Sequence, residues 1–87
     1  MRLDQVTKDL RELILAKIKP VVDRRETETL PGHSLDIDRE SLVQRISGIS
    51  RPVVRAEVDK IMSVLGYWRG CTAGNTLDRY YYWKNKT

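Results

Sequence analysis

Residues 49–55 read ISRPVVR and residues 65–69 read LGYWR, and one helical pattern joins these two segments. Apolar side chains recur between them at spacings of three and four, as in the buried stripe of an amphipathic helix. The stripe consists of Val54, Val58, Ile61, Met62 and Leu65. Ser50 is suited to cap this helix, Pro52 fits its first turn because no N–H is needed there, and Gly66 ends it. The sequence therefore predicts a turn, a capped helix, a glycine stop and then a strand.

A second amphipathic pattern at the start of the chain predicts an earlier helix. Its apolar stripe consists of Leu3, Val6, Leu10, Leu13, Ile14 and Ile18. Pro20 disfavours helical geometry at the residue before it, so we expect this helix to end near residue 18 or 19. Residues 20–34 are rich in charged side chains and contain a Pro-Gly turn signal, so we expect a surface loop there.

Two short elements are expected between that loop and the ISRPVVR segment. Residues 35–37 predict a short strand with its two apolar side chains on one face. A short second helix follows, with Asp38 as its N-cap and Glu40 in its first turn. Its inner face consists of Leu42, Val43 and Ile46. The Ser-Gly pair at residues 47–48 is expected to stop it.

The end of the chain predicts a β-hairpin over residues 66–83, followed by a tail at residues 84–87. Residues 67–71 and 77–83 are rich in aromatic and β-favouring side chains, and the turn-prone sequence TAGNT lies between them. Tyr80, Tyr81, Tyr82 and Trp83 are expected mainly to pack the core and the hairpin. Stacking of bases from single-stranded nucleic acid on these rings is the alternative.

The composition favours one soluble globular domain covering residues 1–87, and the expected order of helices and strands makes it an α+β domain. The chain has 87 residues, of which 40% are hydrophobic and 32% charged, and it has one cysteine. A lone Cys71 cannot form an internal disulfide or a zinc cage, so stability must come from packing. No apolar run approaches the length of a membrane span, and the first residues, MRLD, lack a hydrophobic signal core. We therefore expect a cytoplasmic protein that does not contact a membrane.

Positive charge is concentrated in the second part of the chain. Residues 1–50 carry nine basic and nine acidic side chains, whereas residues 51–87 carry seven basic and three acidic ones. The net charge of +4 therefore arises entirely from the part that contains the third helix and the hairpin. Such asymmetry favours a polyanionic partner, although a solvated basic surface is the alternative.

The order of these elements and several short segments resemble a winged helix-turn-helix domain. Residues 9–15 (DLRELIL) with the Lys-Pro pair at 19–20, residues 48–55 (GISRPVVR) and residues 65–69 (LGYWR) resemble the N-terminal DNA-binding domain of GntR-type bacterial regulators. Residues 79–83 (RYYYW) are more similar to the terminal winged helices of phage and plasmid replication proteins. The linker before the second helix is longer than in the regulators. The resemblance implies three helices followed by a hairpin wing.

The resemblance also implies which side chains contact DNA. The third helix would place its first turn in the major groove, where Ser50, Arg51, Val53 and Arg55 meet phosphates, guanine edges or a thymine methyl group. From the wing, the expected contacts are Arg69, Asn75 and Arg79. Each has a structural alternative: the arginines of the helix could be exposed surface residues, and those of the wing could pair with acids such as Asp78.

We therefore expect double-stranded DNA binding, by a small transcriptional regulator or by the DNA-reading module of a phage or plasmid replication protein. A homodimer or a larger protein complex is compatible with this role. A winged-helix protein-interaction module, or a domain that binds single strands or a replication fork, is the alternative. One His and one Cys, without metal-ligand spacing or a Gly-rich phosphate loop, predict no catalytic residues, no metal and no cofactor.

Overall fold

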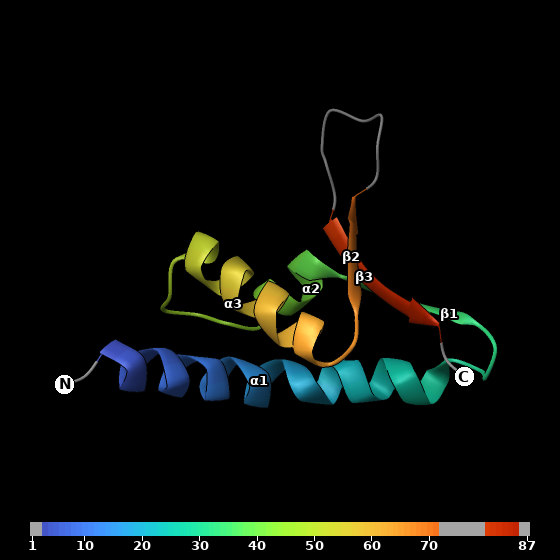
Figure 1. Cartoon of the computed structure of the whole chain (residues 1–87), viewed down its shortest axis with the longest axis horizontal. Coiled ribbons are helices and arrows are strands. Elements are labelled where there is room, and N and C mark those ends of the chain that lie inside the picture. Colours follow the sequence, from blue (N-terminus) through green and yellow to red (C-terminus); the bar gives the residue numbers. More distant parts are fainter. Residues whose placement is uncertain (1–2, 72–79, 86–87) are drawn as a thin grey trace.

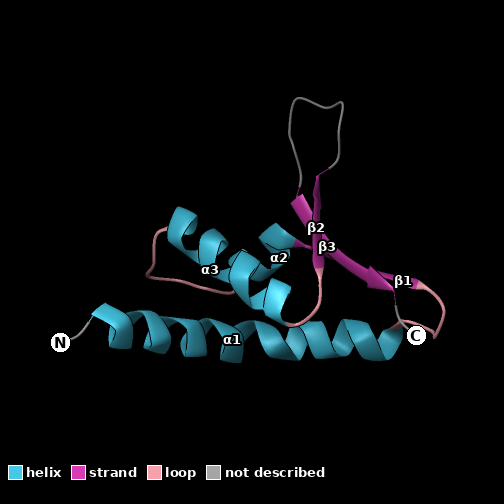
Figure 2. Ribbon diagram, in the orientation of Figure 1, coloured by secondary structure: helices cyan, strands magenta, loops and turns pink. Residues whose placement is uncertain are grey.

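The computed structural model describes residues 3–71 and 80–85, and this part of the chain contains three helices and three strands (Figure 1). In chain order they are α1 (Leu3–Glu28), β1 (Ser34–Asp38), α2 (Arg39–Val43), α3 (Arg51–Val64), β2 (Trp68–Cys71) and β3 (Tyr80–Asn85). Helix α1 lies along one edge of the molecule, and α2, α3 and the sheet all lie on the same side of this helix (Figure 2). The structure therefore confirms the expected small α+β fold, with three helices followed by a pair of antiparallel strands.

Helix α1 is longer than the sequence predicts. It continues through Pro20 to Glu28, so the predicted helix end and the predicted loop over residues 20–28 are wrong. Proline lacks the N–H that would bond to the carbonyl four residues earlier, which weakens the helix at this point. The apolar stripe nevertheless continues into Val22, which is fully buried, and an ion pair of 2.6 Å joins Lys19 to Asp23 across the proline. Burial of this extended stripe compensates for the missing hydrogen bond.

The three strands form one antiparallel sheet in the order β1-β3-β2. In its register, Ile37 on β1 faces Tyr82 on β3, and Trp68 on β2 faces Trp83 on β3. The predicted strand at residues 35–37 and the predicted hairpin pairing are therefore confirmed. Residues 84–85, which we expected in a tail, belong to β3. The hairpin of β2 and β3 projects away from α1 (Figure 2).

The core lies between α1, α3 and the inner face of the sheet. The predicted stripe of α3 is buried at Val54, Val58, Ile61 and Met62, and Leu65 packs against it. From α1 the core takes Ile14, Ile18 and Val22. Leu35, Ile37 and Tyr82 add the inner face of the sheet, because side chains alternate between the two faces of a strand.

The junction between α2 and α3 sets the position of the α3 N-terminus. Asp38 caps α2 as predicted, since its side chain accepts a hydrogen bond of 3.2 Å from the backbone N–H of Glu40. Helix α2 ends at Val43, several residues before the predicted stop, and Gly48 takes a left-handed conformation with φ of 80° in the connecting turn. Ser50 occupies the N-cap position of α3, but its side chain makes no capping hydrogen bond, so that predicted role is wrong.

Candidate nucleic-acid interface

One ridge of α3 carries Arg51, Arg55 and Asp59 at intervals of four residues. Side chains at this spacing lie on the same side of a helix, about 6 Å apart along its axis. Arg51 is exposed and makes no ion pair or hydrogen bond with the other described residues. Arg55 and Asp59, by contrast, are held by neighbouring elements. The ridge therefore begins with a free guanidinium group and continues with side chains of fixed orientation.

Arg55 is held by Glu40, the second residue of α2. Its Nε donates to Glu40 Oε1 at 2.8 Å, and its Nη2 reaches Glu40 Oε2 at 3.5 Å. This pairing lowers the pKa of Glu40 below its ordinary value, so the carboxylate stays charged. A guanidinium group has five N–H donors, and the carboxylate takes two of them. Three N–H donors of Arg55 thus remain for another partner, and the side chain is 34% exposed.

Asp59 joins the ridge to the hairpin. Arg69, on β2, donates from Nη1 to Asp59 Oδ2 at 2.8 Å, and the hydroxyl of Tyr82 donates to Asp59 Oδ1. Arg39, the first residue of α2, lies 3.6 Å from the same carboxylate. Burial of the Tyr82 hydroxyl, followed by its hydrogen bond to Asp59, raises the pKa of Tyr82 far above 10, so the hydroxyl remains a donor. Asp59 therefore fixes the base of β2 against α3.

The ring of Tyr80 adds a second layer to this cluster. The guanidinium carbon of Arg39 lies 4.2 Å from the ring centroid, and that of Arg69 lies 5.7 Å from it. Both distances are within the range of cation–π attraction. The buried Nε of Arg39 has no hydrogen-bond partner among the described residues, which leaves stacking and the Asp59 pair to hold this side chain. Arg39 is thus held between the Asp59 carboxylate and the Tyr80 ring, which Arg69 also contacts.

We refer to Arg39, Arg51, Arg55 and Arg69 together as the arginine surface. Its four cations outnumber the two carboxylates, Glu40 and Asp59, that lie among them. The surplus resides in Arg51, which is exposed, and in Arg69, whose side chain is 55% exposed while sharing Asp59 with Arg39. The surface consequently carries a net positive potential and presents unused N–H donors.

The predicted contact residues fall into three groups, apart from Ser50, which is exposed at the N-cap position of α3. Arg51, Arg55 and Arg69 lie on the arginine surface, and Arg69 pairs with Asp59 rather than with the expected acid of the hairpin. Val53 is 44% exposed and lies off the buried stripe of α3, as the sequence predicts. The last group, Asn75 and Arg79 together with Asp78, lies outside the described residues.

Sequence patterns did not identify five residues of this cluster as parts of a site: Arg39, Glu40, Asp59, Tyr80 and Tyr82. Glu40 was assigned only a role in the first turn of α2, because its partner is 15 residues away. Asp59 did carry a usable signal, since it lies four residues after Arg55 and off the buried stripe. The involvement of Tyr82 depends on the sheet register and has no local signal.

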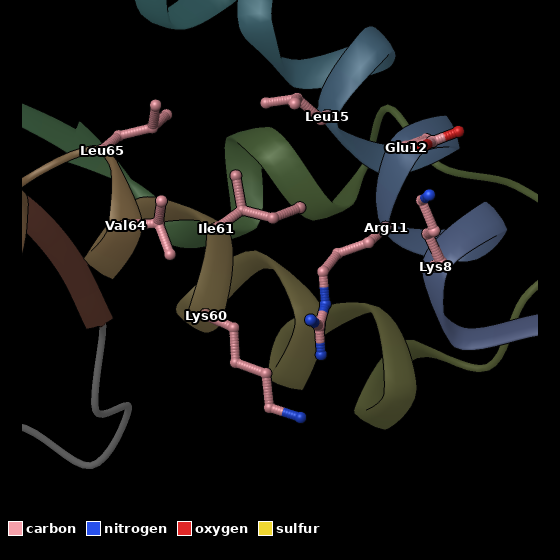
Figure 3. A pocket seen from close by; sticks show the side chains of 8 residues that line it. All are labelled: Lys8, Arg11, Glu12, Leu15, Lys60, Ile61, Val64 and Leu65. Atoms are coloured by element: carbon pink, nitrogen blue, oxygen red, sulfur yellow. The ribbon is translucent and has the colours of Figure 1, made fainter. Parts of the chain in front are cut away.

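A groove between α1 and α3 is the other hollow of note (Figure 3). Its apolar part is formed by Leu15, Ile61, Val64 and Leu65. Lys8, Arg11, Glu12 and Lys60 form its charged part. Arg11 and Lys60 both pair with the buried carboxylate of Glu57, at 2.7 and 3.6 Å. Arg11 joins α1 to α3 through this carboxylate, whereas Lys60 pairs with it within α3, so the groove offers a less charged surface than its residue types suggest.

Comparison of the chain with protein-family models, with curated proteins and with solved structures gave no match. Within the described ranges, no group of three or more His, Cys, Asp or Glu side chains is placed to hold a metal ion. None of the described helices combines the length and the apolar character that crossing a membrane requires.

Proposed function

We propose that this chain is a winged-helix domain that binds double-stranded DNA through the first half of α3 and the hairpin. The observation that carries the proposal is the continuous line Arg51–Arg55–Asp59–Arg69, which leads from the N-terminus of α3 to the base of β2. A major groove about 12 Å wide admits one α-helix. On α3 the ridge borders the buried stripe on the side that faces α2 and β2, with Arg51 exposed and Arg55 and Asp59 partly exposed. The hairpin then lies beside the adjacent backbone.

The pairing of Arg55 with Glu40 supports base recognition in addition to phosphate contact. A guanidinium group that is already oriented loses less conformational entropy when it forms two hydrogen bonds to a guanine edge. Arg51 is unpaired among the described residues and is suited to either phosphate or guanine. The exposed Val53 supplies an apolar contact of the kind that a thymine methyl group accepts. In this proposal Arg55 is held in a fixed orientation for base recognition, whereas Arg51 supplies general attraction to the duplex.

The order of elements also supports the proposal. A helix, a strand, two helices separated by a short turn, and a hairpin whose last strand pairs with the first strand are the parts of a winged helix. In DNA-binding proteins of the helix-turn-helix class, the second helix of the pair enters the major groove. Here that helix is α3.

The test begins with selection of bound duplexes from a random-sequence pool, followed by mobility shifts over a salt series. The affinity should fall steeply with salt, because contacts to phosphate release counterions. Arg51→Ala should weaken binding at least about fivefold. Lys17→Ala is the matched control, since Lys17 is an exposed cation on α1. Absence of duplex binding at low salt, or equal losses in the two variants, would contradict the proposal.

Glu40→Gln separates orientation from simple charge. The substitution removes a negative charge beside the arginine surface, so binding to unrelated duplexes should strengthen. It also releases Arg55 from its fixed geometry, so the preference for the selected sequence should fall. A variant that gains affinity equally for selected and unrelated duplexes would show that Glu40 does not orient Arg55 for recognition.

A further inference from the structure

The outer face of the sheet carries one row of side chains that the proposed DNA contact does not use. In the sheet register, Asp36 on β1 faces Trp83 on β3, and Trp83 faces Trp68 on β2. Side chains directly opposite one another in antiparallel strands lie on the same face of the sheet. We call this set the Asp–Trp–Trp row. Arg69 follows Trp68 in β2 and therefore points to the opposite face.

The two indole rings are stacked, and that of Trp68 is unusually accessible. Their centroids are 5.8 Å apart and their planes differ by 22°. Trp68 is 66% exposed, whereas Trp83 is half-buried. Tryptophan is a large apolar residue that is normally highly buried. An exposed indole supported by a second indole is a preformed flat surface for a planar group.

The third member of the row gives this surface its chemical preference. Asp36 is exposed, and its carboxylate makes no ion pair with any other described residue. Its backbone carbonyl accepts a hydrogen bond of 3.0 Å from Nη2 of Arg25. Because β3 is the central strand, Trp83 has Trp68 on one side and Asp36 on the other. A cation held there would meet an aromatic ring and a carboxylate together, whereas a phosphate would be repelled.

We propose that the Asp–Trp–Trp row binds an arginine side chain presented by a partner polypeptide. A guanidinium group is planar and stacks on indole rings, and its N–H donors match the two oxygens of a carboxylate. Tryptophan and arginine are also the residues that most often dominate protein interfaces. The negative charge of Asp36 favours this occupant over the stacked bases of a single-stranded nucleic acid, whose phosphates it would repel. The site is independent of the arginine surface and is open while that surface is occupied.

The composition of the chain makes this site directly measurable. The protein contains two tryptophans, and both belong to the row, so tryptophan emission reports on this site alone. The ligand to be titrated is an acetylated and amidated Gly-Gly-Arg-Gly-Gly peptide. We expect a saturable change in emission with this peptide and none with the same peptide carrying citrulline, which has the shape of arginine without its charge.

Two exposed variants complete the test. Asp36→Asn should weaken binding of the arginine peptide about fivefold, as expected for an exposed ion pair at its strongest. Ser34→Ala, on the same face of β1, should leave binding unchanged, and far-UV circular dichroism should show that both variants are folded. An unsaturable response to the arginine peptide, equal binding by Asp36→Asn, or a saturable response to oligothymidylate in its place would overturn the proposal. Loss of duplex binding in Arg51→Ala would not alter any of these results.

Discussion

Replacement of Tyr82 by phenylalanine tests whether the core and the arginine surface are joined through Asp59. Tyr82 is 1% exposed, and the substitution keeps its ring, so no large cavity forms. What is lost is the hydrogen bond from the buried hydroxyl to the carboxylate of Asp59. Hydrogen bonds to charged groups contribute about 1.5–3 kcal/mol. Since the Asp59 side chain is 22% exposed and keeps Arg69 as a partner, we expect the lower end of this range.

The expected loss of about 1.5 kcal/mol in the free energy of unfolding should be visible by two methods. In a domain of this size, each kcal/mol lowers the melting temperature by roughly 4–8 °C, so a decrease of about 6–12 °C is expected. Urea denaturation should show a lower midpoint with an unchanged slope. Tyr81→Phe is the matched control, because the Tyr81 hydroxyl makes no hydrogen bond that involves another described residue, and it should change stability by less than about 0.5 kcal/mol. A Tyr82→Phe protein as stable as the original, or equal losses in the two variants, would refute the reasoning.

Three further predictions concern stability. Gly70→Ala should destabilise the hairpin by about 1 kcal/mol, because a Cβ atom would lie 2.9 Å from Cζ at the far end of the Tyr81 side chain, and the same substitution made in a Tyr81→Ser protein should cost much less in urea denaturation. Above pH 10 the protein should lose stability, because Tyr82 ionises at the ordinary tyrosine pKa in the unfolded chain, whereas its raised pKa keeps it neutral in the folded state. The stabilisation that Tyr82 contributes is therefore complete below pH 10 and decreases as the pH rises. Denaturation curves at rising pH should show a smaller loss of stability in Tyr82→Phe. Arg11→Ala should lower the melting temperature through a loss of about 1 kcal/mol, since the buried Glu57 keeps only its longer pair with lysine, and Lys8→Ala should have no comparable effect.

The local elements of this fold could be predicted because their signals lie within a few residues of one another. The apolar stripe of α3, the cap at Asp38 and the alternation in the strands all reflect backbone geometry and burial over short segments. The end of α1 could not be predicted in this way. The rule for the residue before Pro20 is local, whereas the burial of Val22 that overrides it depends on packing against distant elements.

The residues of the candidate site are of the same two kinds: some could be identified from local sequence signals, and others are brought together only by tertiary packing. Arg51 and Arg55 could be identified from their position at the start of a predicted helix. The partners that decide how Arg55 and Arg69 are oriented could not, because Glu40 is 15 residues from Arg55 and Asp59 is 10 residues from Arg69. These residues come into contact only when α2, α3 and β2 pack together. Sequence patterns therefore indicated which cations are present, and tertiary packing determines which of them remain free.

The continuity of α1 through Pro20 has a mechanical consequence. Its first half is joined to α3 by the pair of Arg11 with Glu57. Its second half is joined to the hairpin strands through Glu26, which accepts a hydrogen bond from Tyr67 and pairs with Lys84. Helix α1 thus contacts both of the elements that the proposed function places on a duplex, so its path beyond Pro20 contributes to their spacing together with the direct contacts of Asp59.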